Sequence, residues 1–398
     1  MSACADVPAG RAPERAHEDV VRTDAGAVRG TVTGEHRIFQ GIPYAAPPVG
    51  ELRWDSPEPV RAWTGIREAT RPGSMCPQAG SDYAKVASSD EDCLFLNVTA
   101  PRTPRRNRPV MVWIHGDGAL GSGDLSDVRR IATRGDVVVV TINYRLGVFG
   151  GFGYPGLRGS GMYGLQDQQA ALRWVRRNAA AFGGDPANVT VFGVSWGALS
   201  IGGHLTSPGA EGLFDRAVMQ SGESMMDMLA GSMGEGVPAY PSYAWRTVAE
   251  VEGMGTYVAP RLGCEDLRCL RALPAEEILK VPQIMNMFQT YAYGGETLPR
   301  LPSAEGRLRR RPQPRLLAGL GQLTCRRRVT DVADVTDAAM VEPLTRGNPH
   351  RRFTSTMAVS FPLPFSFDPE PSRTAPRLSP ALDTSASAEL FSSAWYKC

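Results

Sequence analysis

The sequence lacks any long apolar run. Its most apolar stretches, around residues 110–114 and 137–142, are far shorter than the ~20 residues that a membrane-spanning helix needs. Residues 1–20 are rich in Ala, Arg, Glu and Pro and lack the apolar segment of a secretory signal. We therefore expect no membrane association, and the chain as written predicts a cytoplasmic protein.

The sequence also lacks an excess of charge of one sign. Its 43 Lys and Arg residues and 41 Asp and Glu residues give a formal net charge of +2, which predicts no nucleic-acid partner. The cysteines and histidines form no cluster with the spacing of a zinc site, so we expect no metal and no cofactor. With 42% hydrophobic and 21% charged residues, the composition is that of an ordinary globular protein.

Cysteine is scarce, with seven in 398 residues. Two pairs lie close together in the sequence, Cys76 with Cys93 and Cys264 with Cys269, and each pair is a candidate disulfide. Reduced thiols are the usual state in the cytoplasm. From the spacing alone both states stay open.

Apolar periodicity predicts several buried strands and helices. Continuous apolar runs are typical of strands in a parallel sheet that is covered on both faces. Apolar residues at helical spacing indicate the segments that cover it. We expect a hairpin over 20–32, strands over 109–114, 136–142 and 189–192, and helices over 163–182 and 198–205.

The pentapeptide 193–197, Gly-Val-Ser-Trp-Gly, lies between a predicted strand and a predicted helix. In that context a Gly-x-Ser-x-Gly turn holds the serine, here Ser195, in a strained backbone that exposes its hydroxyl. The pattern alone is weak, since Gly and Ser are common, and an ordinary turn is the alternative. A second Gly-rich turn at 115–118, of the kind that forms oxyanion holes, favours the catalytic interpretation.

Longer segments resemble the type-B carboxylesterases, the family that includes cholinesterases and bacterial para-nitrobenzyl esterases. The resemblance implies an α/β-hydrolase fold, with a central, mostly parallel sheet and helices on both faces, incomplete at the C-terminal end. It also implies hydrolysis of a small-molecule carboxylic ester. The matching segments, in the family's order, are 39–50 with 52–54, 91–98, 143–150, 167–172, 182–186 and 220–222.

The resemblance assigns roles to individual residues. Ser195 is the nucleophile that forms an acyl-enzyme. The backbone N–H groups of Asp117, Gly118 and Trp196 form the oxyanion hole. The resemblance also implies that Cys76 is paired with Cys93 and Cys264 with Cys269. With the resemblance included, disulfides and reduced thiols are equally expected at these cysteines.

Three residues inside this site depart from the family's pattern: Asp117 replaces a glycine, Val194 a glutamate and Trp196 a small residue. A carboxylate near the oxyanion opposes its charge by about 3 kcal/mol at intermediate dielectric. Alternatively, Asp117 turns away toward solvent or an arginine, or acts as a base for water that attacks a different acyl or phosphoryl adduct. Trp196 either narrows the acyl pocket or packs behind the turn.

The catalytic acid and histidine of the triad remain unknown. In this fold both follow the serine, and only His204 and His350 do so. His204 lies in the helix after the turn, at a position that is structural in the family. His350 is a candidate, but it lacks the His-Gly context of the family's histidine. The family's acidic segment has no match after Pro302.

We expect a flexible N-terminal segment over 1–19 and an α/β-hydrolase domain over 20–302. We expect residues 303–398 to form a divergent tail rich in Arg, Pro and Ser, for which disorder and a shifted reading frame are the two interpretations. A truncated gene product would give this pattern. The alternative to an esterase is an impaired or silent esterase-like protein, which acts as a binding module or has no function. The oligomeric state is not predicted.

Overall fold

The computed structural model describes residues 18–80, 87–222, 244–302 and 315–318. All of them belong to Met1–Thr324, one of the two compact units of the chain. His17, His350 and three of the cysteines lie outside the described residues.

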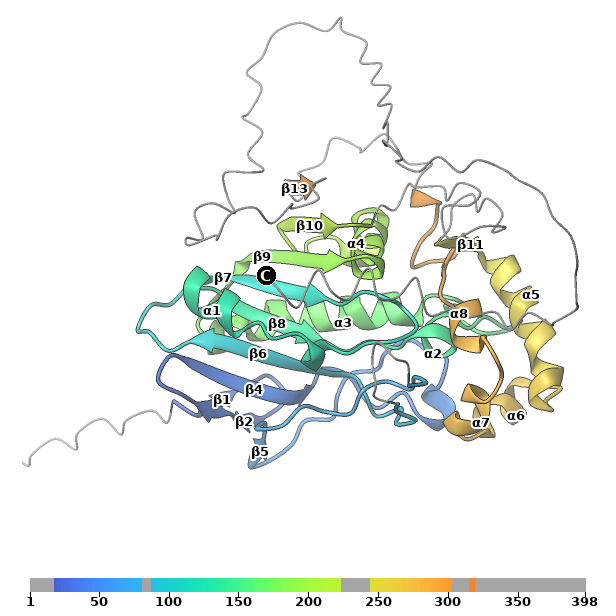
Figure 1. The fold of residues 1–398 in the computed structure, drawn as a ribbon, viewed down its shortest axis with the longest axis horizontal. Helices are drawn as coiled ribbons and strands as arrows, with labels where there is room; N and C mark the ends of the chain where they lie inside the picture. Colours follow the sequence, from blue (N-terminus) through green and yellow to red (C-terminus); the bar gives the residue numbers. More distant parts are fainter. Residues whose placement is uncertain (1–17, 81–86, 223–243, 303–314, 319–398) are drawn as a thin grey trace, which may run out of the picture. The chain divides into compact units, whose positions relative to one another are not determined.

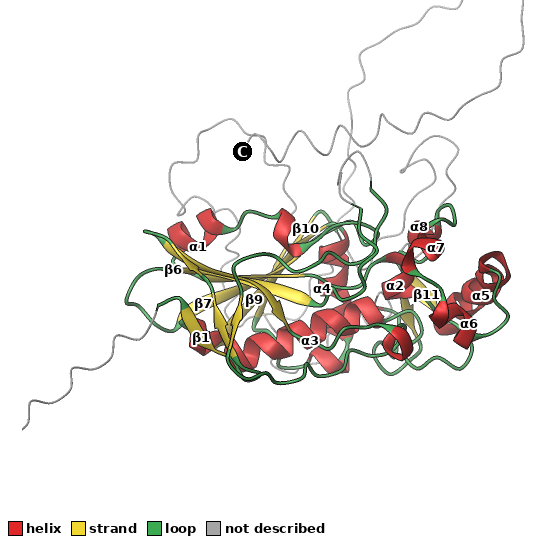
Figure 2. Ribbon diagram, turned by 90° about the horizontal axis from the view of Figure 1, so that it is seen from below, coloured by secondary structure: helices red, strands yellow, loops and turns green. Residues whose placement is uncertain are grey.

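An eight-stranded sheet runs through this unit (Figures 1 and 2), in the order β13-β10-β9-β7-β8-β6-β4-β3. Neighbouring strands from β13 to β8 are parallel, and β6, β4 and β3 add antiparallel pairs at the other edge. The mostly parallel sheet that we predicted is therefore present. The strands are β3 (Thr31–Val32), β4 (His36–Pro43), β6 (Phe95–Pro101), β7 (Arg108–Ile114), β8 (Val138–Ile142), β9 (Gly184–Val194), β10 (Arg216–Gln220) and β13 (Arg315–Ala318).

The central strands are those with the continuous apolar runs. Valines of β7 and β9 face each other in register, Val110 with Val189 and Val112 with Val191, and all four are fully buried. Strand β9 is longer than predicted, because it begins at Gly184, directly after the left-handed Gly183.

Helices cover both faces of the sheet, as Figure 2 shows. Helix α1 (Arg129–Gly135) packs its Ala132 against Trp113, Val139 and Phe192 in a small core. On the other face, α3 (Tyr163–Asn178) and α4 (Trp196–Thr206) contribute to the large core. The predicted helix over 163–182 ends at Asn178 and continues as a 3₁₀ turn, η3 (Ala179–Phe182).

Two small sheets flank the central one. The predicted hairpin is formed by β1 (Val20–Arg22) and β2 (Ala27–Arg29), to which β5 (Ile66–Glu68) adds. Strands β11 (Trp245–Thr247) and β12 (Tyr291–Tyr293) form a parallel pair. The remaining helices are α2 (Gly147–Gly151), α5 (Val248–Val258), α6 (Leu267–Ala272), α7 (Ala275–Leu279) and α8 (Ile284–Met287), with short 3₁₀ turns between elements.

Strand β13 lies beyond the boundary that we predicted at residue 302. Its four residues carry no apolar period that marks a strand, and backbone pairing with β10 defines it, with Arg216 opposite Arg315. The division into 1–19, 20–302 and 303–398 stays a prediction.

Both expected disulfides are formed. Cys76 bonds to Cys93, and Cys264 bonds to Cys269. Spacing left the redox state open, and the pairing implied by the family resemblance is the one present. None of the helices among the described residues has the length and apolarity needed to cross a bilayer.

Candidate active site

Ser195 lies at the turn where β9 ends and α4 begins. Its backbone, with φ 52° and ψ −117°, is in a region that side-chain-bearing residues rarely adopt. Its N–H donates to the Gln220 carbonyl at 2.9 Å, and its carbonyl accepts from the Leu199 N–H at 3.0 Å. The residue is exposed. This is the geometry of a nucleophile turn, in which strain presents the hydroxyl at the end of the sheet.

Glycines make this turn possible, because the surrounding backbones approach too closely for a Cβ atom. A Cβ on Gly197 would lie 2.1 Å from the Ile114 carbonyl oxygen, and one on Gly193 would lie 2.8 Å from the same atom. A Cβ on Gly222 would lie 2.3 Å from the Ser195 carbonyl oxygen. The two glycines of the pentapeptide are therefore needed where β7, β9 and α4 meet.

The second Gly-rich turn lies directly beside Ser195. A Cβ on Gly116 would lie 3.4 Å from the Ser195 Cβ, and the φ angles of Asp117 and Gly118 are +73° and +80°. The Gly118 N–H donates to the Gly116 carbonyl at 3.1 Å, which closes a three-residue γ-turn around Asp117. The Gly118 N–H is thus bonded within the turn, and the oxyanion-hole role of Gly118 stays a prediction.

The Asp117 carboxylate folds back onto its own turn. Its Oδ1 accepts the Ala119 N–H at 3.2 Å, and burial raises the pKa of the carboxyl group above its usual value. The carboxylate is therefore bonded to the backbone, the residue stays partly exposed, and the alternatives for its effect on the reaction stay predictions. The carboxylate can adopt this position because a short acidic side chain caps backbone N–H groups two residues ahead.

Trp196 packs into the core beside the turn. Only 4% of the residue is exposed, and its indole N–H donates to the Tyr291 hydroxyl at 3.1 Å. A Cβ on Gly118 would lie 2.7 Å from the indole ring, so the ring supports the turn from behind. Of the two alternatives for Trp196, the structure shows packing. The Val194 side chain points elsewhere and packs against the small core under α1.

A buried polar network continues behind Trp196. The Tyr291 hydroxyl lies 2.7 Å from Ser200 Oγ, which itself donates to the Trp196 carbonyl at 2.9 Å. The Gln168 amide donates to both hydroxyl groups, at 3.2 Å and 3.3 Å. Burial raises the pKa of Tyr291 to about 12, so the phenol is neutral and can donate. Sequence reasoning missed this network, because its members come from separate elements.

The described histidines are not partners of Ser195. His115 stacks on Tyr144, and its Nδ1 lies 3.0 Å from the Gly116 carbonyl oxygen, to which it donates. His204 donates from Nε2 to the Gln168 amide oxygen at 2.8 Å, which fits the structural role expected of it. Burial lowers the pKa of His115 to about 4 and that of His204 to about 3. His350 lies outside the described residues.

Comparison with known proteins places these features in a family. The sequence profile of the carboxylesterase family matches residues 17–323. The chain belongs to the carboxylesterase family. Para-nitrobenzyl esterase of Bacillus subtilis is 41% identical over 302 residues, which are 72% of this chain and 60% of that protein. A pyrethroid hydrolase of Mus musculus is 39% identical over 72% of this chain and 51% of its own length.

Solved structures agree with this assignment. A PNB esterase structure matches with a TM-score of 0.65 at 38% identity, covering 76% of this chain and 63% of that one. A thermophilic PNB esterase matches with a TM-score of 0.63, also at 38% identity, covering 72% of this chain and 59% of that one. The α/β-hydrolase fold and the family resemblance are thus confirmed. The chain spans less than two thirds of the length of these relatives.

Proposed function

We propose that this chain is a carboxylic ester hydrolase, which acts on small-molecule esters through an acyl-enzyme on Ser195. The observation that supports the proposal is the exposed Ser195 in its strained turn, with the Gly-rich turn beside it. Strain of this kind costs about 1–3 kcal/mol and is retained where it serves a site. Membership of the carboxylesterase family supports the same reaction.

In the proposed reaction, Ser195 Oγ attacks the ester carbonyl carbon. The carbonyl oxygen becomes an oxyanion, which the N–H groups of Asp117 and Trp196 stabilise in our proposal, since Gly118 is engaged with Gly116. The Trp196 N–H is the first of α4, and such N–H groups have no acceptor within their own helix. Collapse of the intermediate breaks the ester C–O bond, and the alcohol leaves with the proton that Ser195 released.

The proton of Ser195 needs an acceptor, and we propose that it lies outside the described residues. His115 and His204 are buried, and each is already bonded to another group. His350 is the remaining histidine after Ser195 and stays our candidate. Oxyanion stabilisation without the triad still leaves roughly 10³- to 10⁴-fold catalysis over water, so slow acylation does not depend on this assignment.

A fluorophosphonate probe tests the proposal directly. We expect one covalent adduct on Ser195 by peptide mass spectrometry, and none in Ser195→Ala. The same pair of proteins should differ in the burst of p-nitrophenol released from p-nitrophenyl acetate. Folded wild-type protein that shows neither adduct nor burst would contradict the proposal and favour a silent esterase-like protein. A His350→Gln variant should lose turnover more than labelling if His350 is the base.

A further inference from the structure

The loop that follows the Gly-rich turn is held by a buried glutamine from a distant segment. The Gln78 side chain donates from Nε2 to the Gly121 carbonyl at 3.0 Å, and its Oε1 accepts the Gly121 N–H at 2.8 Å. Its Nε2 also donates to the Cys76 carbonyl at 3.0 Å, and the residue is completely buried. One amide therefore fixes both backbone groups of Gly121.

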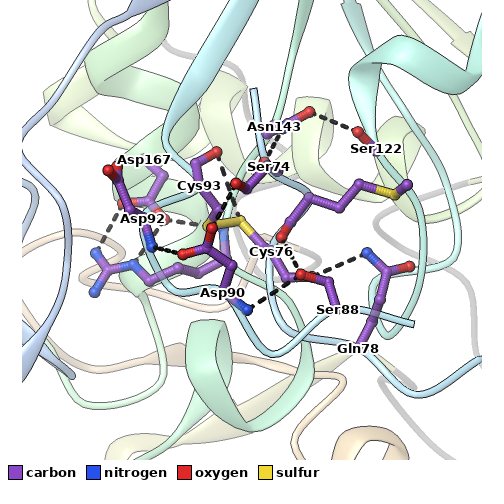
Figure 3. The surroundings of a disulfide bond; sticks show 12 residues. Ser74, Cys76, Gln78, Ser88, Asp90, Asp92, Cys93, Ser122, Asn143 and Asp167 are labelled. Carbon is purple, nitrogen blue, oxygen red and sulfur yellow. Dashed lines mark hydrogen bonds and ion pairs between the residues drawn. A yellow bond between two sulfur atoms is a disulfide. The ribbon is translucent and has the colours of Figure 1, made fainter. Parts of the chain in front are cut away.

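A second amide fixes the same two segments to each other. Asn143 Oδ1 accepts from Ser122 Oγ at 2.9 Å and from the Gly123 N–H at 2.8 Å, while its Nδ2 donates to the Ser74 carbonyl at 3.0 Å. Figure 3 shows Ser74, Cys76 and Gln78 grouped with Asn143 and Ser122 around the disulfide. The loop 121–123 is thus fastened to the segment 74–78 at both ends.

The disulfide anchors that segment to the central sheet. Cys76 bonds to Cys93, which lies just before β6, and both cysteines are buried. The backbone of Gln78 is also paired with that of Ser88, with N–H to carbonyl distances of 2.8 Å and 3.0 Å. The backbone that carries Gln78 is therefore fixed by the disulfide two residues away and by its pairing with Ser88.

Gly121, which Gln78 holds, lies next to His115, and His115 contacts the turn beside Ser195. The φ of Gly121 is +118°, and a Cβ there would lie 2.7 Å from His115 Nδ1, so the imidazole occupies the space that a side chain at residue 121 would need. The same Nδ1 holds the Gly116 carbonyl, the group that accepts the Gly118 N–H. Gly121 and the stacked Tyr144 ring together restrain the imidazole, so we expect movement of Gly121 to loosen the contact between His115 and the Gly116 carbonyl.

We infer that Gln78 is a positioning residue for the oxyanion turn at residues 116–118, and that the Cys76–Cys93 disulfide keeps Gln78 in place. The inference rests on the proposed function, because it concerns the acylation of Ser195. Gln78 acts through Gly121 and His115 and does not touch the reacting atoms. A misplacement of about 1 Å in such a site can lower the rate about a hundredfold.

The first test compares Gln78→Met with Gln169→Met. Gln169 is also a buried glutamine, only 3% exposed, and its amide donates to Ser207 Oγ at 2.9 Å, away from the turn. We expect Gln78→Met to lower kcat for p-nitrophenyl acetate, and the rate of fluorophosphonate labelling, by about 10- to 100-fold, with KM changed little. Gln78→Glu keeps the acceptor for the Gly121 N–H, so its kcat and labelling rate should lie between those of Gln78→Met and wild type.

The second test compares the two disulfides. The double variant Cys76→Ser, Cys93→Ser should lower the labelling rate of Ser195 about as much as Gln78→Met. The matched control is Cys264→Ser, Cys269→Ser, which removes the other disulfide and should leave the labelling rate near that of wild type. Equal losses in the two double variants would show a general effect on stability and would overturn the inference.

A third measurement separates the inference from the proposed function. Hydrogen exchange of the peptide 115–123 should accelerate in Gln78→Met and not in Gln169→Met, whether or not Ser195 reacts. If wild-type protein is not labelled, the proposed function fails, and exchange alone decides the role of Gln78. Unchanged exchange, or equal rate losses in the two glutamine variants, would refute that role.

Discussion

Replacing Asp117 should raise the rate at which Ser195 is acylated. Asp117 is at the centre of the γ-turn, with its carboxylate tied back to the Ala119 N–H. A carboxylate about 5 Å from the oxyanion opposes it by about 3 kcal/mol at an effective dielectric constant of 20. That energy corresponds to about a hundredfold in rate. Asp117→Asn removes the charge but keeps an oxygen for Ala119, and should therefore recover most of this factor.

Asp117→Gly separates charge from backbone strain. The φ of +73° at Asp117 costs a residue with a side chain about 1 kcal/mol, and glycine adopts it freely. We therefore expect the Gly variant to be acylated as fast as the Asn variant and to unfold at higher urea concentration. The Asn variant should unfold at about the same urea concentration as wild type.

The assay is the second-order rate constant of fluorophosphonate labelling between pH 5 and 8, with Ser195→Ala as the blank. Burial raises the pKa of Asp117, and the protonated carboxyl no longer repels the oxyanion. The labelling rate constant of Asp117→Asn divided by that of wild type should therefore be largest above that pKa and should decrease as the pH falls through it. A ratio near one at pH 8 would refute the charge argument.

Three further changes test the packing of the site. Gly197→Ala places a Cβ 2.1 Å from the Ile114 carbonyl oxygen, and should cost about 3 kcal/mol or more in urea unfolding and abolish labelling; near-native labelling would contradict this. The pKa values of His115 and His204, about 4 and about 3, lie below the ordinary 6.5. The stability that each neutral imidazole contributes is therefore complete above pH 6.5 and is lost as the pH falls, and between pH 6.5 and 5 each histidine should lower the free energy of unfolding by about 2 kcal/mol. Equal urea midpoints at pH 7 and pH 5 would exclude this. Arg145→Met leaves a buried carboxylate unpaired and should cost about 3–5 kcal/mol; a loss under 1 kcal/mol would show that water replaces the guanidinium.

Local sequence patterns predicted the elements that carry the proposed nucleophile. The strands β7, β8 and β9 follow continuous apolar runs, and the glycines of the pentapeptide mark where β9 meets α4. These signals work because each depends on residues that are neighbours in the chain. The sequence also indicated Ser195, although only the upstream turn and the family resemblance separated it from an ordinary turn.

The state of the oxyanion turn was not predictable in this way. The bond from the Gly118 N–H to Gly116 depends on the φ of Asp117, which sequence alone does not give. The hydrogen bonds between Gln78 and Gly121 join residues that are 43 positions apart in the sequence, and no periodic pattern indicates such a contact. Trp196 could equally have entered the pocket, and its burial depends on Tyr291, which β12 supplies from much later in the chain.

The strained conformation of Ser195 persists because neighbouring backbones fix it from several sides. A cost of about 1–3 kcal/mol at one residue requires surroundings that leave no relaxed alternative. Here Gln220 holds the Ser195 N–H and Leu199 its carbonyl, while Gly222 lies against that same carbonyl. All of these residues lie within 17–323, the part of the chain that matches the family. The conformation of Ser195 is therefore set by local packing, whereas the reaction rate in our proposal depends on the turn at 116–118, which Gln78 positions, and on the proposed base.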